Sequence, residues 1–329
     1  MLSDGRRLGA HLPLGTGMVK AVERAHEIGA EALQVFCDNP TAWRRRASLP
    51  KELPAFRERI AGYGIAPLAV HAAYLVNLAG DDPDFRERSV SVLAHDMRTS
   101  AAYGASFVNV HIGSHRGGGV ETGIEALAHG VRQVLDAVPP TPDTPRLVLE
   151  NSAGGGFNLG GTIDELSRID AAIGARGADH ERVAYCLDVA HLWGAGYDVR
   201  VERELDSLLD AFEAHIGLDR LVMVHLNDSR AELGSLIDRH EHLGAGRIGP
   251  DGIRNVLTHP RLGHVAFYLE TPGMDDGYDA INLARARDIA AGRPLPELPP
   301  EAFLLHRSRS HSGPADEGEI FDPELATPG

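Results

Sequence analysis

The sequence predicts an α/β protein whose main domain is a (β/α)8 TIM barrel, with its active site at the C-terminal ends of the strands. Strand-like apolar runs alternate with helix-like segments from near the start to about residue 290. This alternation implies a parallel sheet, and eight such units suggest a closed barrel. The 329 residues suffice, since barrels of this kind commonly use about 250. A doubly wound open sheet is the alternative, but the glycine fingerprint expected after its first strand is absent.

Eight strand-helix units follow one another along the chain. The strands are expected in the apolar runs 8–11, 32–36, 66–71, 105–111, 145–150, 182–188, 220–225 and 264–270. The helices are expected at 15–30, 52–64, 84–104, 123–138, 162–174, 203–217, 251–259 and 278–292, beginning with a segment whose apolar positions recur at helical spacing. Residues 1–292 are therefore expected to form the barrel.

The composition changes after Gly292, where Pro, Ser, Gly and acidic residues dominate. Such a segment cannot bury enough apolar surface to order itself, so residues 293–329 are predicted to form a flexible C-terminal tail. Its apolar stretch Glu301–Leu305 is the part that would dock on the barrel.

The composition also limits where the protein can act and which partners it can have. No apolar run approaches the ~20 residues that cross a bilayer, and the N-terminus lacks a signal-peptide core, so we expect a cytoplasmic protein without a membrane partner. Cys37 and Cys186 have no CxxC spacing and are expected to be buried packing residues. The net charge of -15 argues at first sight against a nucleic-acid partner. Bound metal ions would reverse the sign of a local site, however, so the charge excludes nothing.

Acidic residues and histidines stand at the ends of successive predicted strands: His71, His111, Glu150, Asp188, His225 and Glu270. In a parallel barrel these ends form one ring, which carries the active site. A single His or Asp there is most often a cap or turn residue. Six in succession are hard to obtain that way, and clustered carboxylates repel one another unless cations are present. The pattern therefore predicts a metal site.

Three more ligands come from the loops that follow: His191, three residues after Asp188, and the Asp-x-His pair Asp238 and His240. The set then holds five histidines and four carboxylates, which exceeds the roughly three protein ligands of one catalytic zinc. It suits two or three ions. Mixed nitrogen and oxygen donors favour zinc, manganese or iron over magnesium or calcium.

These residues lie in motifs that resemble the endonuclease IV (deoxyribonuclease IV) family of apurinic/apyrimidinic (AP) endonucleases, a group within the xylose-isomerase-like TIM barrels. The match runs from "GAHLPLGTG" to "FYLET", and its motifs are "VHAAYLVNLA", "NVHIGSH", "LENSAGGGFNLG", "CLDVAHLWGAGYD" and "VHLNDSRAELGSLIDRHEHLGAGRIG". All nine metal-ligand positions of the family pattern carry suitable residues.

The resemblance implies a trinuclear zinc site, with Mn²⁺ or Fe²⁺ as alternatives in one or more positions. His71, His111 and Glu150 would hold one ion, and Glu150 would bridge to a second held by Asp188, His225 and Glu270. His191, Asp238 and His240 would hold the third. The implied reaction is hydrolysis of the phosphodiester 5' to an abasic site during base excision repair, leaving a 3'-hydroxyl and a 5'-deoxyribose phosphate. Glu150 and Glu270 are the expected catalytic carboxylates, Glu270 by orienting the attacking water.

The implied partner is duplex DNA with abasic sites or blocked 3' ends, bound by a monomer. Tyr74 and Leu75 match the family's DNA-penetrating loop, where such side chains would wedge into the stack. The early loop "CDNPTAWRRR" departs from many family members, which carry arginine where Thr41 stands. Arg44, together with its neighbours Arg45 and Arg46, is expected to contact phosphate instead. Ordinary loop packing and a solvated charge run are the alternatives.

Several polar residues near the ligands have lesser expected roles. His11 is expected to support the site from outside the nine ligands, and His115 and His242 to be loop residues, one of which would touch phosphate. Asn227 and Asp228 are expected to orient His225 or its loop.

Two rival functions remain open. A metal-dependent sugar isomerase or epimerase of the xylose-isomerase-like class would need only one or two metals, so it leaves the third ligand set unexplained. A non-catalytic barrel that recognises damaged DNA would not need this set of metal ligands. Metal content and turnover on damaged DNA separate these rivals from the endonuclease.

Overall fold

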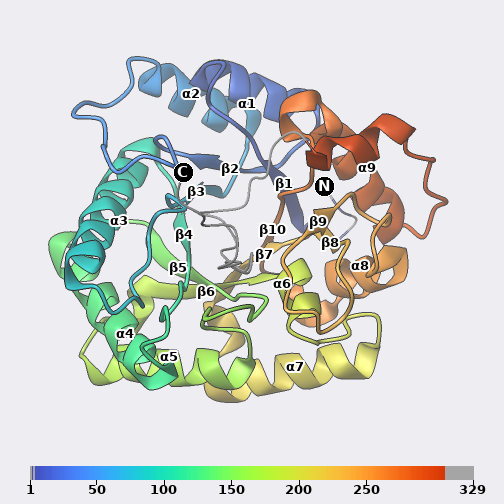
Figure 1. The fold of residues 1–329 in the computed structure, drawn as a ribbon. Helices are drawn as coiled ribbons and strands as arrows, with labels where there is room; N and C mark the ends of the chain where they lie inside the picture. The colour runs from blue at the N-terminus through green and yellow to red at the C-terminus, as the bar shows by residue number, and fades with distance from the viewer. Residues whose placement is uncertain (1, 3, 308–329) are drawn as a thin grey trace, which may run out of the picture.

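The computed structural model describes residue 2 and residues 4–307, and this part of the chain contains a closed barrel of eight parallel strands (Figure 1). The ring runs in the order β1-β10-β7-β6-β5-β4-β3-β2, and β1 closes it by pairing with both β10 and β2. Its strands are β1 (Arg7–His11), β2 (Ala32–Phe36), β3 (Leu68–His71), β4 (Phe107–His111), β5 (Arg146–Glu150), β6 (Val183–Asp188), β7 (Leu221–His225) and β10 (Ala266–Leu269). The predicted (β/α)8 barrel is confirmed.

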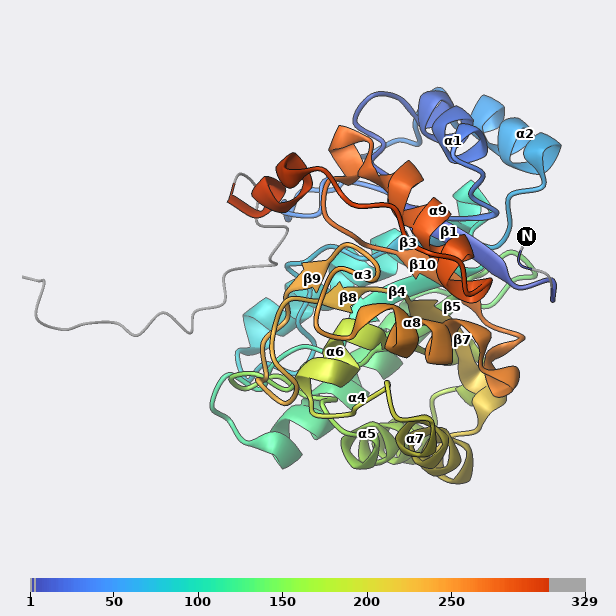
Figure 2. The ribbon, with the colours of Figure 1, turned by 90° about the vertical axis from the view of Figure 1, so that its right-hand side faces the viewer.

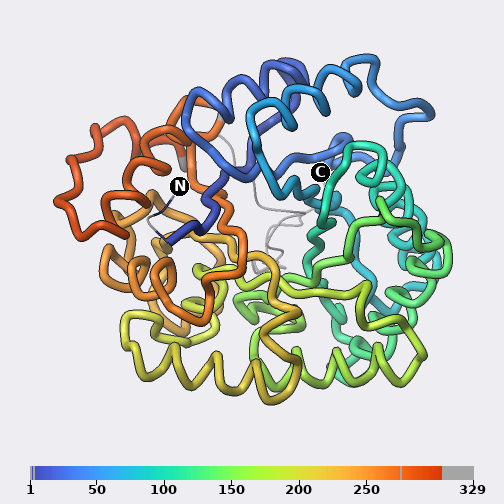
Figure 3. The backbone as a smooth tube through the Cα atoms, turned by 180° about the vertical axis from the view of Figure 1, so that it is seen from behind, coloured from blue at the N-terminus to red at the C-terminus, as the bar shows by residue number. Residues whose placement is uncertain are grey.

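Helices surround the strands on the outside of the ring (Figures 1 and 3). Each predicted helix is present, and the longer helices are α1 (Met18–Glu27), α2 (Leu53–Tyr63), α3 (Pro83–Tyr103), α4 (Val120–Ala137), α5 (Ile163–Ala175), α7 (Glu202–His215), α8 (Gly249–Thr258) and α9 (Tyr278–Ala290). Local signals set their ends. The Asp82 carboxylate caps α3 by accepting from the N–H groups of Asp84 and Phe85, and Gly104 ends it in the left-handed conformation.

The structure also contains short elements that the sequence pattern does not predict. These are α6 (Val189–Gly194), the antiparallel pair β8 (Asp228–Ser229) and β9 (His240–Glu241), and the 3-10 helices η1 (His180–Arg182), η2 (Leu218–Arg220), η3 (Pro260–Leu262), η4 (Met274–Asp276) and η5 (Pro300–Arg307). The strands β8 and β9 lie beyond one end of the barrel strands (Figure 2). They are too short to show a hydrophobic period, but they position site residues.

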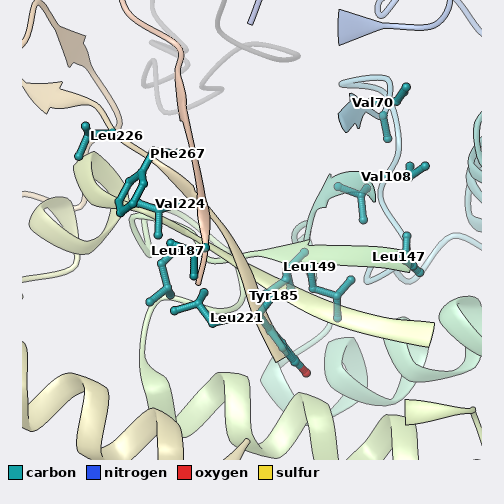
Figure 4. Packing of buried hydrophobic residues seen from close by; sticks show 14 of the residues in the cluster. Val70, Val108, Leu147, Leu149, Tyr185, Leu187, Leu221, Val224, Leu226 and Phe267 are labelled. Atoms are coloured by element: carbon teal, nitrogen blue, oxygen red, sulfur yellow. The ribbon is translucent and has the colours of Figure 1, made fainter. Parts of the chain in front are cut away.

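The core has two layers. Mostly small and medium side chains fill the inside of the barrel, together with the large ring of Tyr268: Ala32, Ala69, Val148, Ala184, Cys186, Met223 and Ala266. A larger apolar layer includes outward-facing residues of the same strands, such as Val108, Leu147 and Leu149 (Figure 4). At Gly9 a Cβ would lie 2.1 Å from the Ala32 carbonyl oxygen, so only glycine allows β1 and β2 to approach this closely. Cys37 and Cys186 are both buried and free, as expected.

The segment 293–307 runs back over the barrel. Ala302 is fully buried, its carbonyl oxygen lies 3.2 Å from His242 Nε2, and Leu295 packs against the core. The rest of the predicted tail, 308–329, lies outside the described residues, and the boundary after residue 292 stays a prediction. None of the helices in the described part of the chain has the length and apolar character needed to cross a membrane.

Candidate metal centre

Six ligand-type side chains meet where the barrel strands end. His71, His111, Glu150, Asp188 and His225 are the last residues of β3 to β7. The strand β10 ends at Leu269, one residue before the predicted end, so Glu270 is the first residue after it. Because His111 pairs with Glu150 and Asp188 pairs with His225 in the strand register, neighbouring strands deliver these groups at the same height.

The Glu150 carboxylate lies at the centre of the cluster, and its side chain is 0% exposed. Its Oε2 lies 3.7 Å from His71 Nε2 and 3.6 Å from His111 Nε2. Its Oε1 lies 3.2 Å from His225 Nδ1. The three residues His71, His111 and Glu150 offer donor atoms that all lie within 4.8 Å of one another.

A second group shares Glu150 and adds residues from β6, β7 and the end of β10. His225 Nδ1 lies 3.2 Å from Glu270 Oε2 and 3.9 Å from Asp188 Oδ2. Donor atoms of Glu150, Asp188, His225 and Glu270 again lie within 4.8 Å of one another. Glu150 is therefore common to two groups, the arrangement expected of a bridging carboxylate.

The third group comes from the loops. The Asp188 carboxylate caps α6 by accepting from the His191 N–H at 2.8 Å, which places His191 beside the mouth. Asp188, His191 and His240 offer donor atoms within 4.8 Å of one another. Asp238 lies against the same histidines, with its two oxygens 3.2 Å from His191 Nε2 and 3.2 Å from His240 Nε2. The structure thus brings all nine predicted ligands together.

Backbone carbonyls fix the orientation of three histidine rings. The Nδ1 atoms of His71, His191 and His240 lie 2.8–2.9 Å from the carbonyl oxygens of Ala72, Asn151 and Glu270. A carbonyl only accepts, so each Nδ1 carries a proton and each Nε2 is the atom that faces the centre and would bind a cation. His225 is reversed, because its Nε2 donates to Gln34 Oε1 at 3.1 Å and its Nδ1 faces the carboxylates.

The donor set fits divalent cations. Glu150 Oε1, His225 Nδ1 and His240 Nε2 are among the buried polar atoms that make no hydrogen bond of normal geometry, although each faces another donor atom of the cluster at 3.2 Å. Burial opposes ionisation of Glu150, but His225 and His111 outweigh it and hold the pKa of this carboxyl well below its usual range. Burial is likewise outweighed at Glu270, where His225 and His11 lower the pKa. Burial opposes protonation of His191 and His240, but Asp188 and Asp238 outweigh it and raise the pKa of both rings, so a bound cation would displace protons from them. Imidazole nitrogens and carboxylate oxygens are ligands that zinc takes in proteins.

Three buried amides that the sequence analysis missed hold the ligands. Asn109 Nδ2 donates to Glu150 Oε2 at 2.5 Å, and Asn151 Oδ1 accepts from the Asp188 N–H at 2.7 Å. Gln34 Nε2 donates to Glu270 Oε1 at 2.6 Å, while its Oε1 accepts from His225. A single amide on β2 therefore fixes one carboxylate rotamer and one histidine tautomer.

Replacing Gln34 with leucine is expected to weaken metal binding by about 10- to 100-fold, the usual effect of removing a residue that orients a ligand. Leucine neither donates to Glu270 nor accepts from His225, so both ligands lose their fixed orientation. Chelator competition with the purified protein measures this affinity. Gln133→Leu, at an exposed position on α4, is the matched control. Equal affinities in the two variants would remove this role from Gln34.

Asn227 and Asp228 were expected to orient His225 or its loop, but their hydrogen bonds go to groups other than His225. Asn227 Nδ2 donates to Asp188 Oδ2 at 2.6 Å, and its Oδ1 accepts from the Glu270 N–H at 2.8 Å. The Asp228 carboxylate accepts backbone N–H groups of Ser229, Gly244, Gly246, Ile248 and Gly249. Asp228 thus orders the loop that follows β7, in agreement with the second part of the expectation.

The remaining histidines lie around the centre. His11 Nδ1 is 3.2 Å from Glu270 Oε1, so this buried side chain supports a ligand from β1. His115 Nδ1 accepts from the N–H groups of Gly117 and Gly119 and shapes its own loop. His242 is fully buried beside Asn282 and Ala302, away from any position where it would touch phosphate.

The residues proposed to contact DNA lie at the rim. Tyr74 is half-buried, with its ring 5.0 Å from that of Phe36 and 5.7 Å from that of His71. Leu75 is also half-buried, and Arg44 is exposed. Arg45 differs from the expected phosphate contact, because its side chain is 8% exposed and lies against Asp96.

Comparisons with known proteins agree with this geometry. The chain matches the family described as xylose isomerase-like TIM barrel over residues 22–292. A D-tagatose 3-epimerase-like protein of 15% identity and TM-score 0.59, aligned over 87% of this chain and 96% of its own, shares the fold. The fold and the cluster of ligands therefore define a member of this class of barrels.

Closer relatives specify the family within that class. A probable endonuclease 4 of Methanoculleus marisnigri is 37% identical over 86% of this chain and 98% of its own length, and one of Solibacter usitatus is 40% identical over 88% and 99%. The crystal structure of endonuclease IV from Thermus thermophilus superposes with a TM-score of 0.75 at 37% identity, covering 87% of this chain and 99% of that one. The chain belongs to the endonuclease IV family.

Proposed function

We propose that this protein is a zinc-dependent AP endonuclease that hydrolyses the phosphodiester 5' to an abasic site in duplex DNA, leaving a 3'-hydroxyl and a 5'-deoxyribose phosphate. The observation that carries the proposal is the convergence of nine His, Asp and Glu side chains in three adjoining groups. Membership of the endonuclease IV family supports the same reaction. We expect the protein to act in the cytoplasm as a monomer, and blocked 3' ends to be further substrates.

Each group would hold one cation. His71, His111 and Glu150 would hold the first; Glu150, Asp188, His225 and Glu270 the second; His191, Asp238 and His240 the third. Cations bound there would neutralise phosphate charge, lower the pKa of a water and stabilise the leaving alkoxide. Three divalent ions against four carboxylates would leave a local charge of about +2, which attracts a phosphodiester despite the acidic chain.

The chain's own residues prepare the site for this reaction. Asn109, Asn151 and Gln34 fix the ligands before substrate arrives, so little reorganisation is needed during the reaction. Glu270 has one oxygen held by Gln34 and the other directed at the cluster, and we assign to it the orientation of the attacking water. Tyr74 and Leu75 at the rim would enter the gap in the base stack, and Arg44 would contact phosphate.

A sugar isomerase would explain less of the site. Proton transfer between neighbouring sugar carbons needs one or two ions and a base. The third group, built from α6 and β9 together with Asp238, would then have no role. The epimerase-like structures share the fold at low identity and carry no argument about the reaction.

Incision of a duplex with one abasic site tests the proposal directly. Protein loaded with zinc is expected to cut the strand on the 5' side and leave a 3' end that a polymerase extends. Protein stripped by a chelator is expected to lose this activity and to regain it when zinc or manganese returns. A protein verified to hold its metals that leaves the duplex intact would contradict the proposal and direct the search to sugar substrates.

A further inference from the structure

Two loops at the mouth of the barrel contact the same buried carboxylate. The loop of residues 37–46 follows β2 and carries Arg44, and the loop of residues 72–77 follows β3 and carries Tyr74 and Leu75. The shared carboxylate is that of Asp96, on the inner face of α3. Asp96 is not one of the nine proposed metal ligands, so the metal site does not explain why it is there.

Asp96 uses each oxygen for a different loop. Its Oδ1 lies 3.3 Å from Arg45 Nε, with the two side chains 3% and 8% exposed. Its Oδ2 accepts from the Ala73 N–H at 3.4 Å. One residue of α3 therefore contacts the backbone of one loop and the buried guanidinium of the other.

Further contacts join the same two loops. Arg45 Nη1 donates to the Asn39 carbonyl oxygen at 2.8 Å, so the guanidinium that reaches Asp96 also fixes its own loop. The Tyr74 N–H donates to the Pro40 carbonyl oxygen at 3.1 Å. The loops therefore form one unit. Asp96 is the residue of α3 that contacts both loops, whereas Ser89 Oγ accepts from the Asn77 N–H of one loop and the Tyr103 hydroxyl donates to the Cys37 carbonyl oxygen of the other.

Burying the charged pair Asp96–Arg45 costs free energy, because both groups lose their hydration. Packing alone therefore does not explain the presence of the pair. Burial raises the pKa of Asp96 to about 6 although Arg45 opposes the shift. An apolar pair of similar volume stabilises a protein as well or better, whereas a pair of buried charges has a defined geometry. The pair lies next in sequence to both groups proposed to contact DNA, because Arg44 precedes Arg45 and Tyr74 follows Ala73.

We infer that Asp96 is a positioning residue for DNA recognition, which holds loops 37–46 and 72–77 in the arrangement that binds the damaged duplex. The inference rests on the proposed function for its substrate. Arg45 is then the partner of Asp96 and makes no phosphate contact, while Arg44 remains available to DNA.

Asp96→Asn and Arg45→Gln test the inference in the full-length, zinc-loaded protein. Asp170→Asn is the control, because Asp170 on α5 forms an ion pair with Arg220 at 2.7 Å near the opposite end of the barrel strands, with side chains only 10% and 12% exposed. Asp170 also accepts from the Tyr185 hydroxyl, so this variant likewise disturbs a mostly buried carboxylate. Three quantities are measured for each variant: metal content, KM and kcat on an abasic duplex, and deuterium uptake of the backbone without DNA.

Both Asp96→Asn and Arg45→Gln are expected to raise KM by about tenfold and to leave kcat within about twofold, because binding is lost while the chemistry is kept. Metal content should stay at the wild-type value, and deuterium uptake should rise in 37–46 and 72–77. Asp170→Asn should change neither KM nor these two loops.

Unchanged uptake in the two loops would overturn the inference, as would an unchanged KM or an equal KM change in Asp170→Asn. Failure of the proposed function gives a different result. In that case the wild-type protein with full metal content does not incise the duplex, and the deuterium uptake still shows whether Asp96 holds the loops.

Discussion

Replacing Glu150 with glutamine is expected to lower the rate of abasic-site incision by about 10^4-fold or more, the scale seen when one member of a catalytic unit is removed. Glu150 belongs to two of the three ligand groups, so a single substitution affects two proposed ions. Glutamine keeps the size of the side chain but loses the negative charge. Its amide would also place a donor beside either Asn109 Nδ2 or the imidazole nitrogens.

Metal analysis of the purified variant provides the second measurement. Wild-type protein is expected to carry about three zinc ions and Glu150→Gln about one, in the group of His191, Asp238 and His240. Asp170→Asn is again the control, since it changes a buried carboxylate outside the centre. A Glu150→Gln protein that retains three ions and wild-type incision would show that this carboxylate bridges no ions.

The positions of the strand ends were the part of the site that sequence reasoning located best. In a parallel barrel, each strand-helix unit returns the chain to the same rim, so a ligand at each strand end implies a ring of ligands. His71, His111, Glu150, Asp188 and His225 follow this rule to the residue. Glu270 deviates by one position because β10 ends at Leu269.

Residues inside the strands were missed although the sequence carried a signal for them. Gln34 and Asn109 stand within the apolar runs "ALQVF" and "FVNVH". A polar side chain buried in a strand is costly unless it is hydrogen-bonded, so each implies a partner nearby. Asn109 also lies two residues before His111, on the same face of β4. Periodicity alone could not name the partners, because these come from β5, β7 and the end of β10.

The loops set the limit of prediction from sequence. The run Arg44–Arg46 looked uniform, yet Arg44 is exposed and Arg45 is buried against Asp96, which lies far along the chain on α3. Likewise, His242 lies near the ligands in sequence but packs against Asn282 of α9 and Ala302 of η5. In both cases the burial of a side chain depends on contacts distant in the chain, which local spacing does not record.

The Glu270 carboxylate has two distinct environments, and this difference predicts the effect of its amide. Gln34 Nε2 donates to Oε1 at 2.6 Å, whereas Oε2 lies 3.2 Å from His225 Nδ1. In Glu270→Gln the amide oxygen is expected to stay opposite Gln34, because two NH2 groups there would face each other. The new NH2 group then takes the place of Oε2, where it cannot accept a proton or a hydrogen bond from water.

Glu270→Gln is therefore expected to lower kcat by about 10²- to 10⁴-fold, the usual contribution of a positioned proton acceptor, with KM for the abasic duplex little changed. Metal content should fall by at most one ion, because three of the four residues in that group remain. Gln34→Leu distinguishes the orientation of Glu270 from its charge, because this variant keeps the Glu270 carboxylate. Its kcat at saturating zinc should therefore fall less than that of Glu270→Gln. Parallel losses of metal and turnover in Glu270→Gln would leave Glu270 with the role of a ligand alone.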